Sequence, residues 1–434
     1  MIGSTMSRPR FIDQRTAILI VVANMIGTGV FTTLGLQAAG IPDGTALLLL
    51  WLIGGLIALC GALSYAELAA ALPRSGGEYH FLSRIFQPLL GQLAGWVSVS
   101  VGFAAPVALA AMAMGHYAAT VFPTTPTAIA VTALVLVTAV HAFDLNLGRR
   151  VQVVATWLKI AVILLFCAVG LSLPATSGSL SVLPSATTLE AVWSAPFAVS
   201  LIYVAYAYSG WNAAAYVVDE VQDPRRAVPR ALLLGTLIVT LLYLLLNLTF
   251  LRTVEYAALV GRVEVGALSA ETIFGAVGGH LMSLVLTLLL VSTVSAMVLA
   301  GPRVLERIGE DLPFFRPLSV RNRRGAPTRA VLLQQGLALA MILTGSFEGV
   351  LSFAGFTLTL FAVITVAGVI RLRRREPDLP RPFRVPWYPL PPLVFILVSL
   401  ASLVFLALER PLPVLLAVLL LGLGWVSVRL AGRP

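Results

Sequence analysis

The chain has 434 residues, of which 59% are hydrophobic and only 11% are charged, and its mean hydropathy is +0.95. A soluble protein of this length carries about 25% charged residues. This composition therefore excludes a soluble globular protein and predicts an all-α polytopic membrane protein. The net charge of +10 would suit nucleic-acid binding, but the basic residues stand between apolar runs. The two cysteines, Cys60 and Cys167, lie inside such runs and suit neither a disulfide nor a metal site.

Twelve apolar segments of about 20 residues follow one another and are predicted to span the membrane. They lie at 16–39, 44–71, 87–119, 126–143, 151–172, 191–218, 229–250, 273–300, 328–345, 347–370, 390–408 and 412–430. The first is too long for the core of a cleaved signal peptide, so it is kept as a span. The nearly continuous stretch 336–370 is divided at TGSFEG.

The basic residues are distributed unequally between the two sides of the predicted membrane. All but one of the 29 are arginines. With the N-terminus inside, 25 arginines fall inside and three, Arg252, Arg262 and Arg410, fall outside. By the positive-inside rule this predicts a multi-pass plasma (inner) membrane protein with both termini cytoplasmic, and it supports an even number of spans.

Two spans contain residues that are poor helix formers. Residues 23–31, ANMIGTGVF, lie within the first span, and residues 208–212, YSGWN, lie within the sixth. Each glycine costs a helix about 1 kcal/mol relative to alanine. Small-residue helix packing explains an isolated G-x-G. Matched interruptions in corresponding helices of two halves, flanked here by Asn24 and Asn212, favour two broken helices at a transporter binding site.

Broken helices expose charged ends that can bind a zwitterion. Free N–H groups at the start of the outer half-helix, together with the helix dipole, attract a carboxylate. Free carbonyl groups at the end of the inner half-helix accept from an ammonium group. Glycine lets a ligand approach the backbone closely. Two such breaks that face each other would therefore bind an amino acid.

Lys159 is the only lysine, and it lies in the fifth span. At 1.5 Å per residue it is about 13 Å deeper than Arg150. Snorkelling to the interface requires a site nearer a helix end, so we expect Lys159 to face the protein interior. A buried lysine there would act as a proton carrier or as a fixed cation.

Four segments resemble, in order, the motifs of the amino acid–polyamine–organocation superfamily, and most closely its L-type amino acid transporters and their bacterial relatives. They are MIGTGVF (25–31), SYAELAAALPRSGGEYHFL (64–82), AYSGWNAAAYVVDEVQDPRRAVPRAL (207–232) and RRREPDLPRPFRVPWYP (373–389). The resemblance implies one transporter domain, 1–434, with a LeuT-like fold. Five helices (16–172) and five more (191–370) would form an inverted repeat with discontinuous helices 1 and 6, and 390–430 would add helices 11 and 12.

The resemblance also implies a substrate site. Thr28 and Gly29 would bind the substrate carboxylate through backbone N–H groups, beside Gly27. The carbonyl groups that would receive the amino group belong to Met25, Tyr206, Ala207 and Ser209.

Further roles follow from the same resemblance. Gly210 would lie at the second break, Trp211 would close over the substrate as an aromatic gate, and Asn212 would line the side-chain pocket. Tyr243 matches a seventh-helix tyrosine near the site, although a packing role is about as plausible. Lys159 matches a lysine of sodium-independent members, which occupies the place of a sodium ion between helices 1 and 8. Glu67 is expected to be an inner-gate salt-bridge partner or a loop anchor.

The implied function is sodium-independent secondary transport of neutral L-amino acids by alternating access, as an exchanger. Neutral substrates are favoured because no Asp or Glu lies deep within a span. Proton-coupled symport through Lys159 remains an alternative, and a membrane amino acid sensor or channel is one of another class.

No enzymatic activity, catalytic residue, cofactor or metal is expected, because no nucleophile–base pair or metal-ligand spacing is present. The loop after the third span, TVFPTTP, has no cysteine. A disulfide-linked heavy chain is therefore not expected, and the protein would be a monomer or homodimer surrounded by membrane lipid, with no nucleic-acid partner.

Overall fold

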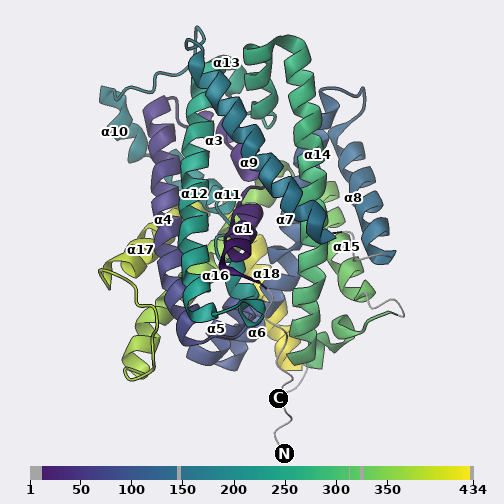
Figure 1. Cartoon of the computed structure of the whole chain (residues 1–434), viewed down its shortest axis with the longest axis vertical. Coiled ribbons are helices and arrows are strands. Elements are labelled where there is room, and N and C mark those ends of the chain that lie inside the picture. Colours follow the sequence, from purple (N-terminus) through teal and green to yellow (C-terminus); the bar gives the residue numbers. More distant parts are fainter. Residues whose placement is uncertain (1–11, 144–147, 312, 323–326, 431–434) are drawn as a thin grey trace, which may run out of the picture.

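The computed structural model describes residues 12–143, 148–311, 313–322 and 327–430. Within these ranges the regular structure is helical (Figure 1). The α-helices are α1 (Gln14–Met25), α2 (Gly29–Thr32), α3 (Leu34–Ala38), α4 (Gly44–Ala71), α5 (Gly77–Ile85), α6 (Pro88–Val97), α7 (Ala104–Ala119), α8 (Pro126–Phe143), α9 (Gly148–Ser172), α10 (Ala186–Val192), α11 (Ala195–Ala207), α12 (Pro224–Thr253), α13 (Tyr256–Leu259), α14 (Val265–Asp311), α15 (Thr328–Thr344), α16 (Phe347–Arg375), α17 (Leu390–Glu409) and α18 (Pro411–Leu430). Four short elements complete the set: the π-helical η1 (Ser98–Gly102) and the 3-10 helices η2 (Ala213–Tyr216), η3 (Val218–Glu220) and η4 (Pro313–Ser319).

Eight of the described helical segments are long and apolar enough to cross a membrane, and the pair α10 and α11, bent by 65°, makes up to nine. Three shorter apolar helices, within α8, α9 and α15, lie in ranges that were predicted to span. The chain is therefore a multi-pass membrane protein. Twelve spans and the inverted repeat remain predictions, because the apolar stretches found within α8, α9 and α15 are only 10–17 residues long.

The predicted division of residues 336–370 is confirmed. Helix α15 ends at Thr344 and α16 begins at Phe347. The Ser346 hydroxyl accepts a hydrogen bond from the Gly349 N–H at 3.0 Å, which caps the new helix.

Helix α1 lies in the middle of the bundle, and α12 packs along both α1 and α4 (Figure 1). Small residues permit this close packing. A Cβ atom added to Gly55 of α4 would lie 2.5 Å from the Thr240 side chain of α12, and one added to Gly235 would lie 2.6 Å from Val21 of α1. The driving force between helices in lipid is van der Waals contact, so glycine at these positions sets how closely α12 can approach.

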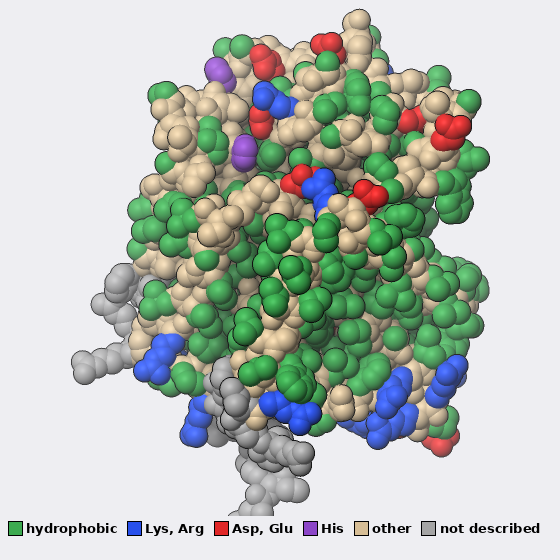
Figure 2. Space-filling view, turned by 180° about the vertical axis from the view of Figure 1, so that it is seen from behind, with side chains coloured by type: hydrophobic (Ala, Val, Ile, Leu, Met, Phe, Trp, Pro, Cys, Tyr) green, Lys and Arg blue, Asp and Glu red, His purple; other side chains and the backbone are tan. Residues whose placement is uncertain are grey.

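The bundle has two ends of opposite character. We call one end of the bundle the Gln14 face; it holds the starts of α1 and α12 and the end of α4. At this end Ile12 forms an isolated parallel β-bridge with Val221. The N–H of Ile12 donates to Glu220 O at 3.0 Å, and the N–H of Gln222 donates to Ile12 O at 2.8 Å. The Asp43 face carries the opposite ends of these helices. Figure 2 shows basic side chains gathered at the lower, Gln14 face, acidic side chains mostly at the upper face, and an apolar band between them.

Candidate functional site

The first predicted break lies where α1 ends. Helix α1 stops at Met25, and the next helical residue is Gly29. The Gly27 N–H donates to Met25 O at 2.7 Å, so the chain makes a tight turn in place of a helical step. The Thr32 hydroxyl donates a hydrogen bond to Thr28 O at 2.9 Å. This local pairing satisfies part of the backbone that the break releases inside the membrane.

The second predicted break lies where α11 ends. Helix α11 stops at Ala207, and 3-10 turns begin at Ala213. Between them Gly210 has φ = +97°, a conformation that residues with a Cβ rarely adopt. The sequence YSGWN is therefore a true interruption of the helix.

The two breaks lie against each other, and each glycine is needed for the contact. A Cβ atom on Gly29 would lie 2.5 Å from Ala207 Cα, and one on Gly210 would lie 2.9 Å from the Asn24 carbonyl. Real Cβ contacts are essentially never this short. Two segments about 180 residues apart in sequence thus form one backbone-lined site.

Tyr243 of α12 joins both breaks through its hydroxyl. The hydroxyl oxygen lies 2.5 Å from Met25 O and 3.1 Å from Ala207 O, and it donates toward these carbonyl groups. The side chain is fully buried. Its ring contacts Trp51 at 5.5 Å and Tyr208 at 5.1 Å between centroids. Two of the carbonyl groups predicted to bind the substrate amino group are therefore engaged by a tyrosine.

The Tyr206 side chain, near the end of α11, reaches the first break. Its hydroxyl lies next to the Thr28 side chain. Both residues are buried, with 6% and 4% of their surface exposed. Ser209 and Gly210 are half-buried beside them. The sequence prediction used only the carbonyl group of Tyr206, and the side-chain contact was missed.

Lys159 of α9 binds Ile26, the first residue of the first break. Its ammonium donates to Ile26 O at 3.1 Å and to the Thr293 hydroxyl of α14 at 2.9 Å. Only 6% of Lys159 is exposed. No ion pair joins it to an acidic residue in the described part of the chain, so its partners there are neutral oxygens. Thr293 belongs to no motif that the sequence analysis used, so only this contact in the structure identifies it as a partner of Lys159.

The side chains of Trp211 and Asn212 contact residues of α4, α5 and α17. The Trp211 ring packs edge-to-face on Tyr65 at 4.7 Å and contacts Phe395 of α17 at 6.3 Å. A Cβ atom on Gly61 would lie 2.9 Å from the Trp211 ring. The Asn212 amide donates to Glu78 at 2.6 Å.

Glu78 of α5 is a polar centre that the sequence analysis did not single out. Its carboxylate accepts from the Tyr65 hydroxyl at 2.8 Å, from Asn212, and from the Tyr216 hydroxyl through a short hydrogen bond. It thereby ties α4 and α5 to the chain beyond the second break. A Cβ atom on Gly77 would lie 2.5 Å from Tyr216, so the first residue of α5 also packs tightly there. The only sequence signal was the position of Glu78 directly after two glycines in SGGEY.

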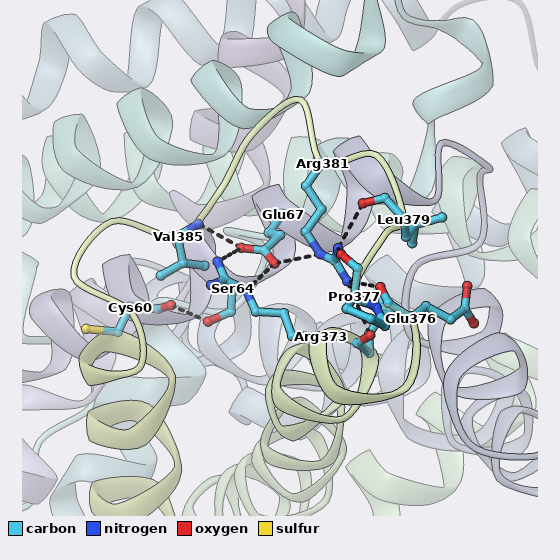
Figure 3. A network of polar contacts seen from close by, with 10 residues as sticks. Cys60, Ser64, Glu67, Arg373, Glu376, Pro377, Leu379, Arg381 and Val385 are labelled. Carbon is cyan, nitrogen blue, oxygen red and sulfur yellow. Dashed lines mark hydrogen bonds and ion pairs between the residues drawn. The ribbon is translucent and has the colours of Figure 1, made fainter.

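Glu67 of α4 is the centre of a second network on the Gln14 face (Figure 3). Its carboxylate, 1% exposed, accepts from Arg373 Nε and Nη2 at 2.8 and 2.6 Å and from the Val385 N–H at 2.7 Å. Arg381 lies 3.5 Å away and donates to three backbone carbonyl groups of the α16–α17 connection and to Leu372 O in the last turn of α16. Glu67 thus anchors this loop with salt bridges, as expected.

The pKa of His80, in α5 at the Gln14 face, is lowered to about 4. Burial is the main cause, and repulsion from Arg74 adds to it, while Asp219 opposes the shift. His80 is therefore neutral at physiological pH.

Comparison with known proteins identifies the family. The family model described as amino acid permease matches residues 12–423. The chain is similar to the serine/threonine exchanger SteT of Bacillus subtilis, with 28% identity over 88% of this chain and 87% of the relative. It is also similar to the large neutral amino acids transporter small subunit 2 of Mus musculus, with 29% identity over 96% of this chain and 78% of the relative. A third relative is the mouse Asc-type amino acid transporter 1, with 28% identity over 92% of this chain and 76% of the relative. The predicted superfamily is confirmed: the chain belongs to the amino acid permease family of membrane transporters.

Proposed function

We propose that this protein is a sodium-independent exchanger of neutral L-amino acids that works by alternating access. The observation that carries the proposal is the contact between two broken helices, with a buried lysine bound to the first. The N–H groups of Thr28 and Gly29, at the start of α2, suit the carboxylate of an amino acid. The carbonyl groups of Met25 and Ala207 suit its ammonium, which would displace the Tyr243 hydroxyl.

Lys159 supports sodium independence. Its ammonium supplies a permanent positive charge at Ile26 O, where a sodium-coupled transporter would need a bound ion. The partners of Lys159 are a carbonyl and a hydroxyl, so the charge links α1 to α14 without a dissociable cation. In this arrangement the driving force comes from a second amino acid moving in the opposite direction, as the name of the exchanger SteT suggests.

Neutral substrates are supported by the distribution of carboxylates. Glu78, which binds Asn212, already accepts hydrogen bonds from three side chains. A lysine or arginine substrate would need an acid with free acceptors. The permeases that resemble this chain include one for large neutral amino acids and one for serine and threonine.

Proton-coupled symport is the second candidate, and the neutral surroundings of Lys159 favour it. Because no carboxylate is paired with the ammonium in the described residues, the proton can leave without stranding an opposite charge. Lys159 would then be the proton carrier.

The proposal also includes the orientation of the protein in the membrane and its oligomeric state. The concentration of basic side chains at the Gln14 face favours cytoplasmic termini in the plasma membrane. The connection between α7 and α8 has no cysteine, so the transporter would work without a disulfide-linked heavy chain, as a monomer or homodimer.

The test is uptake of labelled amino acids into sodium-free proteoliposomes. One set contains an unlabelled amino acid and no ion gradient, and the other is empty with an inward proton gradient. An exchanger takes up label only in the first set. Uptake into empty vesicles driven by protons would replace exchange with symport. Absence of uptake in both sets, with protein that binds no amino acid, would overturn the proposed substrate class.

A further inference from the structure

Three arginines lie at the Asp43 face, and one of them has no carboxylate partner. Arg262 lies 3.3 Å from Glu264, and Arg410 lies 2.7 Å from Glu348. Arg252, in the last turn of α12, forms no ion pair within the described ranges. Its guanidinium donates one hydrogen bond, to Leu173 O at 3.3 Å, and its buried Nε has no partner. A guanidinium carries five donors arranged for an anion, so most of the donors of Arg252 are unused.

Arg252 stands at the end of an apolar groove between α4 and α12. The groove has a volume of about 480 Å³. It is lined by Thr45, Leu48, Leu49, Leu52, Leu241, Leu244, Leu245 and Leu248. Arg252 follows Leu248 by four residues and Leu245 by seven, which puts it on the same stripe of α12, one turn beyond the last leucine. The groove opens away from the bundle, because Leu52, Leu241 and Leu245 are 37–55% exposed.

A second polar group without a partner lies at the same end of the groove. The Thr45 hydroxyl is buried and has no hydrogen-bond partner among the residues that the structure describes. Helices α4 and α12 run in opposite directions and touch at Gly55 and Thr240. Ten residues from that contact, Thr45 on α4 lies level with Phe250 on α12, within one turn of Arg252.

We propose that this groove, together with Arg252 and Thr45, binds one anionic glycerophospholipid. One acyl chain lies along the seven leucines, and the phosphate accepts hydrogen bonds from the Arg252 guanidinium and the Thr45 hydroxyl. Both groups stand at the end of a membrane-spanning helix, which is the depth of the headgroups. Phosphate oxygens match the planar fork of arginine. A bound lipid braces α4 against α12, the two helices that supply Trp51 and Tyr243 to the contact between the breaks.

The experiment measures lipid retention by native mass spectrometry after the purified protein is exchanged into mixed micelles. The micelles contain dioleoyl phosphatidylglycerol or dioleoyl phosphatidylcholine at equal concentration. We expect the wild-type protein to retain one phosphatidylglycerol in preference to phosphatidylcholine. Arg252→Ala is expected to reduce that preference about tenfold, because it removes charge-assisted hydrogen bonds. Leu245→Trp, which fills the groove, is expected to abolish retention of both lipids.

Arg262→Ala is the matched control, since it removes an arginine from the same face and leaves the groove intact. It is expected to behave like the wild-type protein. Unchanged retention in Arg252→Ala, or an equal loss in Arg262→Ala, would overturn the proposal. Retention of oleate equal to that of phosphatidylglycerol would overturn the phospholipid in favour of a free fatty acid. Size-exclusion elution and circular dichroism establish that each variant is folded, and Arg252→Ala keeps the test decisive if Leu245→Trp does not fold.

Discussion

Replacing Lys159 with methionine removes the ammonium while nearly keeping the length and volume of the side chain. The change deletes two hydrogen bonds, at 3.1 Å to Ile26 O and at 2.9 Å to Thr293. Each bond from a charged group contributes about 1.5–3 kcal/mol, so together they contribute about 3–6 kcal/mol. Removing the charge also removes the free-energy cost of burying it, which is several kcal/mol, and this stabilises the folded state. We therefore expect the free energy of unfolding to change little.

The link between the first break and α14 is nevertheless lost in Lys159→Met. If half of the bond energy, about 1.5–3 kcal/mol, serves the transport cycle, the exchange rate falls about 10- to 150-fold. The assay is exchange of labelled serine or leucine in proteoliposomes between pH 6 and 8, with melting temperature measured in parallel. Leu158→Met is the control, because Leu158 is 51% exposed on the same helix. Exchange by Lys159→Met within twofold of wild type, with an unchanged pH profile, would refute a transport role for the lysine.

Three further predictions concern the site and the Gln14 face. Thr28→Val is expected to keep the fold and weaken substrate binding about tenfold, since one hydrogen bond is lost; unchanged affinity in a binding titration would restrict recognition to the backbone. Glu78→Ala removes the carboxylate that three side chains donate to, so the exchange rate and the melting temperature should both fall; Glu78→Gln should fall less, and the control Glu376→Gln, on the same face, should resemble wild type. Because the pKa of His80 is about 4 in the fold against an ordinary 6.5, the unfolded chain binds a proton between these values that the folded chain does not. Stability should therefore decline from pH 6.5 to pH 4 by about 3 kcal/mol, and His80→Gln should lack this part of the decline in thermal unfolding across pH.

Features that depend on local chemistry could be predicted from the sequence. The glycines at 27, 29 and 210 interrupt helices because glycine is a poor helix former, and both interruptions are present. The interior position of Lys159 followed from its depth in an apolar span, where an exposed ammonium is costly.

Features that depend on how helices rotate against one another could not be predicted. Trp211 packs on Tyr65 and Phe395, and Asn212 binds Glu78, because 3-10 turns after Gly210 change the direction of each side chain. The carboxylate of Glu78 meets donors from two distant segments, and no periodicity in either segment indicates the meeting. The partner of Lys159 on α14 was hidden for the same reason.

The β-bridge between Ile12 and Val221 has a mechanical consequence. It ties the chain just before α1 to the chain just after the second break, through two backbone hydrogen bonds. Glu78 and Ser75 fasten the same exit segment to the connection between α4 and α5. These contacts couple the two segments mechanically. In the proposed transport cycle, a substrate leaving toward the Gln14 face would require both segments to move together, so residues that never touch the substrate would affect the rate.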